Sequence, residues 1–89
     1  MPEIITIIHH EVGLHLRPAS EFVRTAAKYS SDIKVTHGET TANAKSILDV
    51  LTIGVHKGAE ITIKAEGDDA EEALQALEHL VLDNFGEGK

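Results

Sequence analysis

The sequence predicts an α+β fold in which three helices cover one face of a four-stranded antiparallel sheet. Short β-branched segments that alternate in polarity are interspersed with segments that repeat apolar residues about every 3.6 positions, in the order β-α-β-β-α-β-α. Strands that no helix separates are too close along the chain for a parallel crossover, so they are expected to run antiparallel. The chain has 89 residues and is expected to form one domain over residues 1–89.

The first strand and the first helix follow from two different spacings of apolar residues. Residues 4–8 are β-branched and predict a strand, but both phases of their alternation are apolar, which leaves the buried face undecided. A helix is expected from residue 16 to about residue 27. Its core-facing positions have the spacing of an amphipathic helix, and they are Ala19, Phe22, Val23, Ala26 and Ala27.

Three further strands are expected, two of them joined as a hairpin. Ile33 and Val35 alternate with polar residues, and a turn at residues 37–39 connects this strand to a short one over residues 40–44. The last strand has the same alternation, and its apolar residues are Ile61, Ile63 and Ala65. Alternation of this kind is typical of strands with one buried and one solvated face.

The final helix is marked by acidic residues at its start and a glycine at its end. Asp68 and Asp69 are candidates for the N-cap, and Gly86 is expected to terminate the helix. Its expected buried residues are Ala73, Leu74, Leu77, Leu80 and Val81.

The composition restricts the classes of function. A formal net charge of −7 argues against non-specific binding to nucleic acid, which needs a basic surface. With one Tyr, two Phe and no Trp, a base-stacking platform is not expected. The absence of cysteine excludes disulfides and thiolate metal sites and agrees with a reducing cytosol. No signal peptide is recognisable, and no apolar stretch approaches the roughly 20 residues that span a bilayer. We expect a cytoplasmic protein that binds other proteins.

The candidate reactive residue is His15, which lies just before the first predicted helix. Arg17 and Pro18 open that helix, and proline is well tolerated in a first helical turn because its missing N–H would lack an intrahelical partner. The free N–H groups and the positive end of the helix dipole favour an anion at this position. A neutral imidazole beside an arginine at such a site is a suitable phosphoryl acceptor.

The first helix also carries a basic stripe, which we define as Arg17, Arg24 and Lys28. At about 100° per residue, Arg24 and Lys28 project within about 20° of Arg17, one on each side of it, opposite the core-facing positions. Such a stripe binds phosphate or an acidic partner, or it is simply a solvated face. His15 likewise has a simpler alternative, in which it only hydrogen-bonds a free N–H group as a weak helix cap.

A second, short helix is expected from Ser46. The spacing of Ser46 to Asp49 is that of a capping box with Asp in place of the usual Glu, and Gly54 is expected to end the helix. Apolar residues surround most of the helix: Ile47, Leu48, Val50, Leu51 and Ile53. Either some of them are exposed as a partner site, or the helix is more buried than its length suggests. A phosphate on Ser46 would suit the helix dipole and add a charge of about −2 beside these side chains.

Together these segments carry a family resemblance. Gly13-Leu14-His15-Leu16-Arg17-Pro18-Ala19 resembles the active-site signature of HPr, the histidine-containing phosphocarrier of the phosphoenolpyruvate-dependent sugar phosphotransferase system. Lys45-Ser46-Ile47, followed by Gly54, resembles the regulatory signature of that family. The resemblance covers essentially the whole chain and implies an open-faced β-sandwich.

The resemblance implies a phosphoryl relay. Enzyme I, phosphorylated from phosphoenolpyruvate, would pass the phosphoryl group to Nδ1 of His15, with Arg17 as the charge partner, and a sugar-specific IIA domain would receive it. In many members of Gram-positive type a dedicated kinase phosphorylates the residue that corresponds to Ser46, and the product serves as corepressor for a catabolite-control regulator. The protein would be a monomeric covalent intermediate, not an enzyme, and would need no cofactor or metal.

Two residues depart from the family pattern. Many members have a small polar residue where this chain has Val12, and a small residue is common where it has Leu16. The first change removes a side-chain donor, and the second enlarges the apolar rim around His15. The expected partner surface comprises Leu16, Ser20, Arg24, Ile47, Leu48 and Leu51.

Three other functions remain open at this point. The chain could be a regulatory or nitrogen-branch paralogue that acts mainly by binding proteins. It could be a small ligand-binding module in which His15 is only a cap. It could also bind a metal through His9, His10 and His15, although their spacing matches no standard ligand set.

Overall fold

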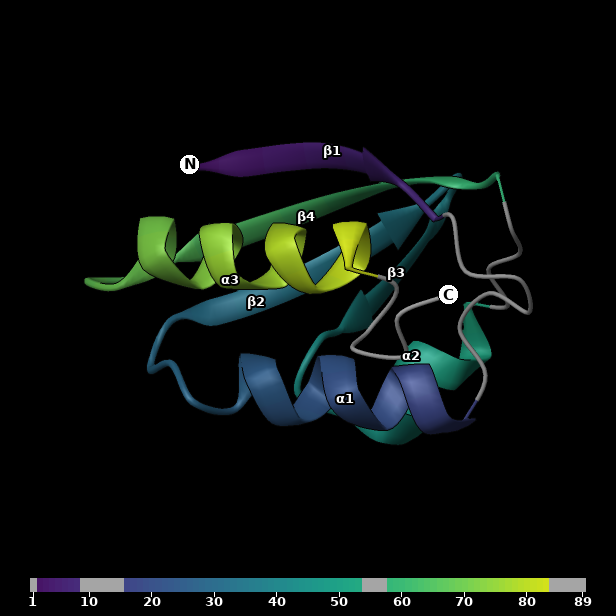
Figure 1. Ribbon diagram of the computed structural model, residues 1–89, viewed down its shortest axis with the longest axis horizontal. Helices are drawn as coiled ribbons and strands as arrows, with labels where there is room; N and C mark the ends of the chain where they lie inside the picture. The colour runs from purple at the N-terminus through teal and green to yellow at the C-terminus, as the bar shows by residue number, and fades with distance from the viewer. Residues whose placement is uncertain (1, 9–15, 54–57, 84–89) are drawn as a thin grey trace.

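The computed structural model describes residues 2–8, 16–53 and 58–83, and the side chains of residues 16 and 17 lie outside this description. The predicted order β-α-β-β-α-β-α is confirmed (Figure 1). The elements are β1 (Glu3–Ile7), α1 (Leu16–Ala26), β2 (Asp32–His37), β3 (Thr40–Asn43), α2 (Ile47–Thr52), β4 (Glu60–Glu66) and α3 (Ala70–Leu82). No helix in the described part of the chain is long and apolar enough to cross a membrane.

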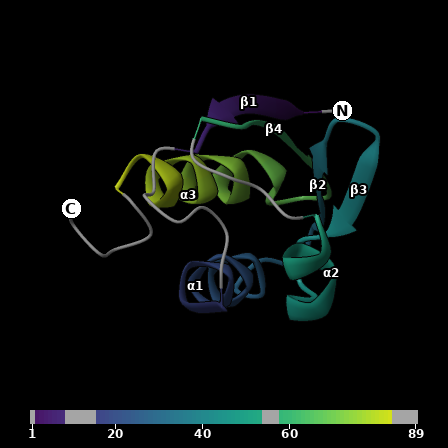
Figure 2. The same ribbon diagram turned by 90° about the vertical axis from the view of Figure 1, so that its right-hand side faces the viewer.

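The four strands form one antiparallel sheet in the order β1-β4-β2-β3. The last strand in sequence therefore lies between the first two, and β1 and β3 form the two edges. All three helices lie on one side of the sheet (Figures 1 and 2). α3 packs against β1 and β4, α1 lies between α2 and α3, and α2 contacts β3. The predicted fold class is confirmed.

The buried face of β1, which the sequence left undecided, is the face of Ile4, Thr6 and Ile8. Thr6 and Ile8 are buried and Ile4 is half-buried, whereas Ile5 and Ile7 on the other face are 57% and 45% exposed. β2 and β4 follow the predicted alternation, with buried residues Ile33 and Val35 in β2 and Ile61, Ile63 and Ala65 in β4. In β3, Ala42 is the buried residue. One face of the sheet thus builds the core with the helices, and the other faces solvent.

Most of the buried positions predicted for the first and last helices are correct, but the predicted C-terminal ends of these helices are not. Ala19, Phe22 and Ala26 are buried as expected, but Ala27 lies past the end of α1 and is exposed. The last turn tightens, because Lys28 and Tyr29 donate to carbonyls three residues back, at 3.1 and 3.2 Å. Ala27 itself still donates to the carbonyl of Val23, four residues back, at 2.9 Å, so the tightening begins after it.

The last helix ends earlier than expected. α3 ends at Leu82, with Asp83 as its C-cap, not near Gly86. Ala73, Leu74, Leu77 and Val81 are buried, while Leu80 is half-buried at the margin of the core. Gly86, like Gly54 after α2, lies outside the described residues.

Asp69 occupies the N-cap of α3 but makes no side-chain cap bond, which corrects the predicted role of this carboxylate. Its oxygens instead accept from the backbone N–H of Ser30 at 2.9 Å and of Ser31 at 3.0 Å, and from the Ser31 hydroxyl. These bonds join the start of α3 to the loop between α1 and β2. A Cβ at Gly67 would lie 2.8 Å from the Ser31 Cα, so this close approach requires glycine.

Candidate functional site

The candidate site begins at the N-terminus of α1. The helix starts at Leu16, so His15 is the residue immediately before it in the chain, as the sequence predicted. His15 itself lies outside the described residues, as do Val12 and the side chains of Leu16 and Arg17. The approach of Arg17 to His15 therefore remains a prediction. Pro18 is buried in the first turn of α1, the position that the missing N–H of proline permits.

The exposed face of α1 carries the described part of the basic stripe. Arg24 is 70% exposed in its side chain and lies 3.4 Å from the carboxylate of Glu21, one turn earlier. An exposed pair of this kind contributes little to stability, which leaves the guanidinium available to an acidic partner. Lys28 is also exposed, and Ser20, one turn before Arg24, is half-buried.

Ser46 is the N-cap of α2, as predicted. Its backbone is extended (φ −113°, ψ 115°), and its hydroxyl oxygen accepts from the N–H of Asp49 at 3.3 Å. The reciprocal bond of a capping box, from the Ser46 N–H to the Asp49 carboxylate, is not formed in this described segment. The Ser46 N–H donates to the carbonyl of Asn43 at 3.0 Å, and Asp49 accepts instead from the Asn43 N–H at 3.3 Å. Aspartate is one methylene shorter than the usual glutamate, so its carboxylate bonds the turn before the cap.

Lys45 fixes this cap to the other helix. Its ammonium donates to the carbonyl of Tyr29, just past the end of α1, at 2.6 Å, and its N–H donates to the Asn43 side chain at 2.9 Å. A cation is favoured there because carbonyls at a helix C-terminus carry partial negative charge. The sequence prediction missed this contact. Its partners are 16 residues apart, and no local pattern signals such a pair.

The apolar residues of α2 divide between core and surface. Val50 and Ile53 are buried, Ile47 and Leu51 are half-buried, and Leu48 is 74% exposed. Both alternatives that the sequence left open for this helix are thus partly right, because its inner face is more buried than expected while one large side chain stands in solvent. α2 packs beside α1 (Figure 2). We term the exposed residues of these two helices, Arg24 and Lys28 of α1 and Leu48 of α2, the surface shared by α1 and α2.

Two of the predicted segments lie close together. Lys45, beside the N-cap of α2, bonds to the carbonyl of Tyr29 just past the C-terminal end of α1, and the two helices pack against each other. No group of His, Asp or Glu that would hold a metal ion occurs among the described residues, and His9, His10 and His15 lie outside them.

Comparison with known proteins identifies the family. Residues 3–83 match the model of the family described as "PTS HPr component phosphorylation site". The chain is 42% identical over 83 residues to a phosphocarrier protein HPr of Mycoplasma capricolum, and the match covers 93% of each chain.

Solved structures agree with this match. The crystal structure of HPr-C-His from Thermoanaerobacter tengcongensis has a TM-score of 0.94 and 46% identity, covering 98% of each chain. A crystal structure of an HPr dimer from the same organism has a TM-score of 0.79 and 46% identity, covering 98% of this chain and 100% of its own. The matched region includes both the segment around His15 and the cap at Ser46. The chain therefore belongs to the HPr family, the phosphocarrier components of the phosphotransferase system.

Proposed function

We propose that this protein accepts a phosphoryl group on Nδ1 of His15 from phosphorylated Enzyme I and passes it to sugar-specific IIA domains in the cytoplasm. The observation that carries the proposal is that α1 starts at the residue after His15, within the region that matches the HPr family. An 11-residue helix offers unpaired N–H groups and a positive dipole end at its first turn.

Each transfer exchanges one phosphorus–nitrogen bond for another. The Nδ1 lone pair of neutral His15 attacks phosphorus while the bond to the donor histidine breaks, and the donor imidazole leaves as a neutral base that keeps its own ring proton. No net proton is required, so the main electrostatic task is to hold three negatively charged oxygens. Backbone N–H groups at the start of α1, together with the guanidinium of Arg17, suit that task.

Such a carrier stabilises the anion moderately. Donors that bound the phosphoryl group very tightly would raise the barrier to the next transfer, because only interactions stronger in the transition state than in the ground state accelerate a step. A few backbone N–H groups and one arginine meet this requirement. The protein then acts as a covalent intermediate in a relay and not as an enzyme with turnover of its own.

The first experiment is labelling with Enzyme I and radiolabelled phosphoenolpyruvate. We expect close to one label per chain that is stable in alkali and lost in acid, as for a phosphoimidazole. The His15→Ala variant should take up no label, whereas His79→Ala, at an exposed histidine of α3, should be labelled like the wild type. Label that persists in His15→Ala would contradict the assignment.

We further propose that Ser46 is a site of regulatory phosphorylation by the serine kinase of this family, which would prepare the protein to bind a catabolite-control regulator. Ser46 is half-buried at the N-cap of α2, and the exposed Leu48 lies on the same helix. A phosphate there adds a charge of about −2 to the surface shared by α1 and α2 and repels an acidic partner.

This second proposal has its own test. Incubation with ATP and the serine kinase should give an acid-stable label that the Ser46→Ala variant loses and the Ser20→Ala variant keeps. If Ser46→Ala still takes up the label, the site is wrong. The Ser46-phosphorylated protein should also accept phosphoryl groups from Enzyme I more slowly, and an unchanged rate would remove the proposed effect on partner binding.

A further inference from the structure

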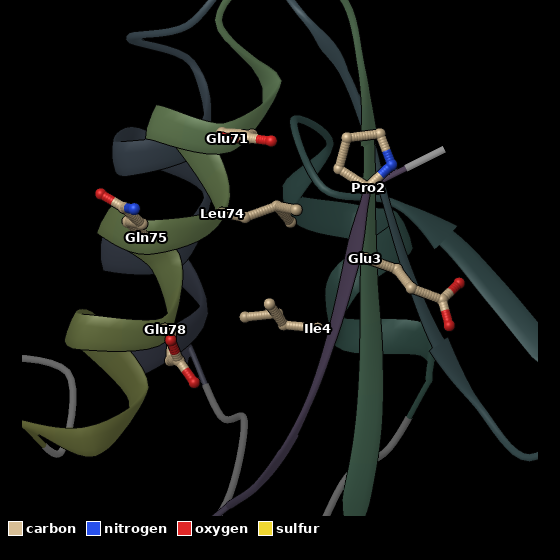
Figure 3. Close-up of a pocket in the computed structure, with 7 residues that line it drawn as sticks. All are labelled: Pro2, Glu3, Ile4, Glu71, Leu74, Gln75 and Glu78. Carbon is tan, nitrogen blue, oxygen red and sulfur yellow. The ribbon is translucent and has the colours of Figure 1, made fainter.

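The free edge of β1 borders a groove that lies apart from the surface shared by α1 and α2. The groove has a volume of about 320 Å³ and runs between β1 and α3 (Figure 3). Its floor is apolar, because Leu74 from α3 and Ile4 from β1 point toward one another across it. In the order β1-β4-β2-β3 it lies at the edge opposite β3, the strand that α2 contacts.

The charge around this groove has one sign. The residues that line it are Pro2, Glu3, Ile4, Glu71, Leu74, Gln75 and Glu78, and none of these described residues is basic. Glu3 turns away from the groove and lies 3.8 Å from the ammonium of Lys64. Glu71 and Glu78, two turns apart on α3, form no ion pair within the described part of the chain, and Glu71 extends toward β1. These two carboxylates give the groove a negative rim that no basic residue of its described lining compensates.

The backbone of β1 offers a second recognition element. The Ile8 N–H donates to Ala59, and the Pro2 carbonyl accepts from Ala65, so the even-numbered residues of this antiparallel pair direct their backbone groups toward β4. The alternating pattern turns the N–H and C=O groups of Glu3, Ile5 and Ile7 to the other edge. β1 pairs only with β4 among the described strands. A row of backbone donors and acceptors thus runs beside the acidic rim.

We propose that this edge binds an extended basic segment of a partner protein, which adds a strand to β1 and places lysine or arginine side chains in the groove. Alternate side chains of an added strand face opposite sides of the sheet. On one side they meet Glu71 and Glu78, and on the other they meet the exposed Ile5 and Ile7. A segment that alternates basic and apolar residues therefore matches both faces.

The same observations disfavour a second copy of this chain as the occupant. Pairing of two β1 strands would bring the acidic α3 of each copy beside that of the other, with no basic residue in either groove lining. A basic partner neutralises these charges, whereas a second copy doubles them.

The test uses a synthetic peptide with blocked termini in which lysine and valine alternate. Its length of about eight residues is within the usual range of a strand. In amide NMR titrations of the full chain we expect shifts at Glu3, Ile5 and Ile7, and slower hydrogen exchange at these three amides. The Glu71→Gln/Glu78→Gln variant should weaken binding about fivefold. The matched control Glu72→Gln, an exposed position of α3 outside the groove lining, should bind like the wild type.

A backbone test separates strand addition from charge attraction alone. Ile5→Pro removes an N–H that faces the free edge and no bond to β4, so it should abolish binding while circular dichroism shows a folded chain. A peptide that alternates glutamate and valine should not bind. Shifts confined to another face, or equal affinity for the double variant and wild type, would overturn the proposal. Self-association of the chain through β1 that increases with protein concentration would overturn it as well. If Ile5→Pro fails to fold, the hydrogen-exchange result at Glu3, Ile5 and Ile7 decides in its place.

Discussion

Asp69 joins the start of α3 to two serines that lie 38 and 39 residues away in the chain. The Ser31 hydroxyl, the Ser30 N–H and the Ser31 N–H donate to its carboxylate and hold its pKa below the ordinary value of 3.8. Hydrogen bonds to the ionised form have this effect because they stabilise the charge. Ser31 is buried, so loss of the carboxylate would leave its backbone N–H without that acceptor.

We therefore expect Asp69→Ala to lower the midpoint of thermal unfolding by about 5 °C at neutral pH. Because the folded pKa is depressed, the stabilisation is complete above the unfolded pKa and is lost as the pH falls through the folded value. The difference between variant and wild type should thus shrink below about pH 4. Asp68→Ala, at the exposed neighbour, serves as the control and should change little. A pH-independent effect, or equal effects of both variants, would refute this role of Asp69.

At the scale of elements, the short helix α2 buries Val50 in the core and exposes Leu48 to solvent. We expect Leu48→Ser to leave the free energy of unfolding within about 0.5 kcal/mol of wild type, because the side chain is 74% exposed. Val50→Ala, two positions along and fully buried, should cost about 2 kcal/mol. Denaturant unfolding measures both. Leu48→Ser should nevertheless slow phosphoryl transfer from Enzyme I, and a normal transfer rate would remove Leu48 from the partner surface.

The elements could be predicted from the sequence because each depends on local spacing. The alternation of Ile61, Ile63 and Ala65 and the helical spacing of Leu74, Leu77 and Val81 predicted their buried faces correctly. The buried face of β1 could not be predicted, because Ile4 and Ile5 are equally apolar and only the pairing with β4 and the packing of α3 decide between them. A local pattern also predicted the Ser46 cap.

The remaining features depend on partners distant in sequence. Asp69 is at the N-cap of α3 as predicted, but its side chain makes no cap bond, because the carboxylate bonds to serines 38 and 39 residues away. Lys45 bonds to a carbonyl at the far end of another helix. The partial exposure of α2 depends on how α1 and β3 pack against it. His15 was identified from its position before a helix and from the family signature, neither of which requires tertiary contacts.

At the scale of the whole molecule, the strand order separates two surfaces. The surface shared by α1 and α2 lies toward the β3 edge, and the acidic groove lies at the β1 edge. Although the net charge is −7, the exposed Arg24 and Lys28 lie on α1. We therefore expect an acidic partner to be attracted to the face of α1 and a basic partner to the edge of β1, and both encounters should weaken as salt is raised.

The function proposed for the molecule depends on His15 carrying the phosphoryl group on Nδ1. The most direct measurement is nitrogen and phosphorus NMR of the protein, labelled with nitrogen isotope in its histidines, after treatment with Enzyme I and phosphoenolpyruvate. We expect one phosphoramidate signal, coupled to Nδ1 of a single imidazole and absent from His15→Ala. The assignment of Nδ1 of His15 would be contradicted by phosphorus coupled to any other side chain. It would also be contradicted if no phosphoramidate formed with an Enzyme I that phosphorylates another HPr.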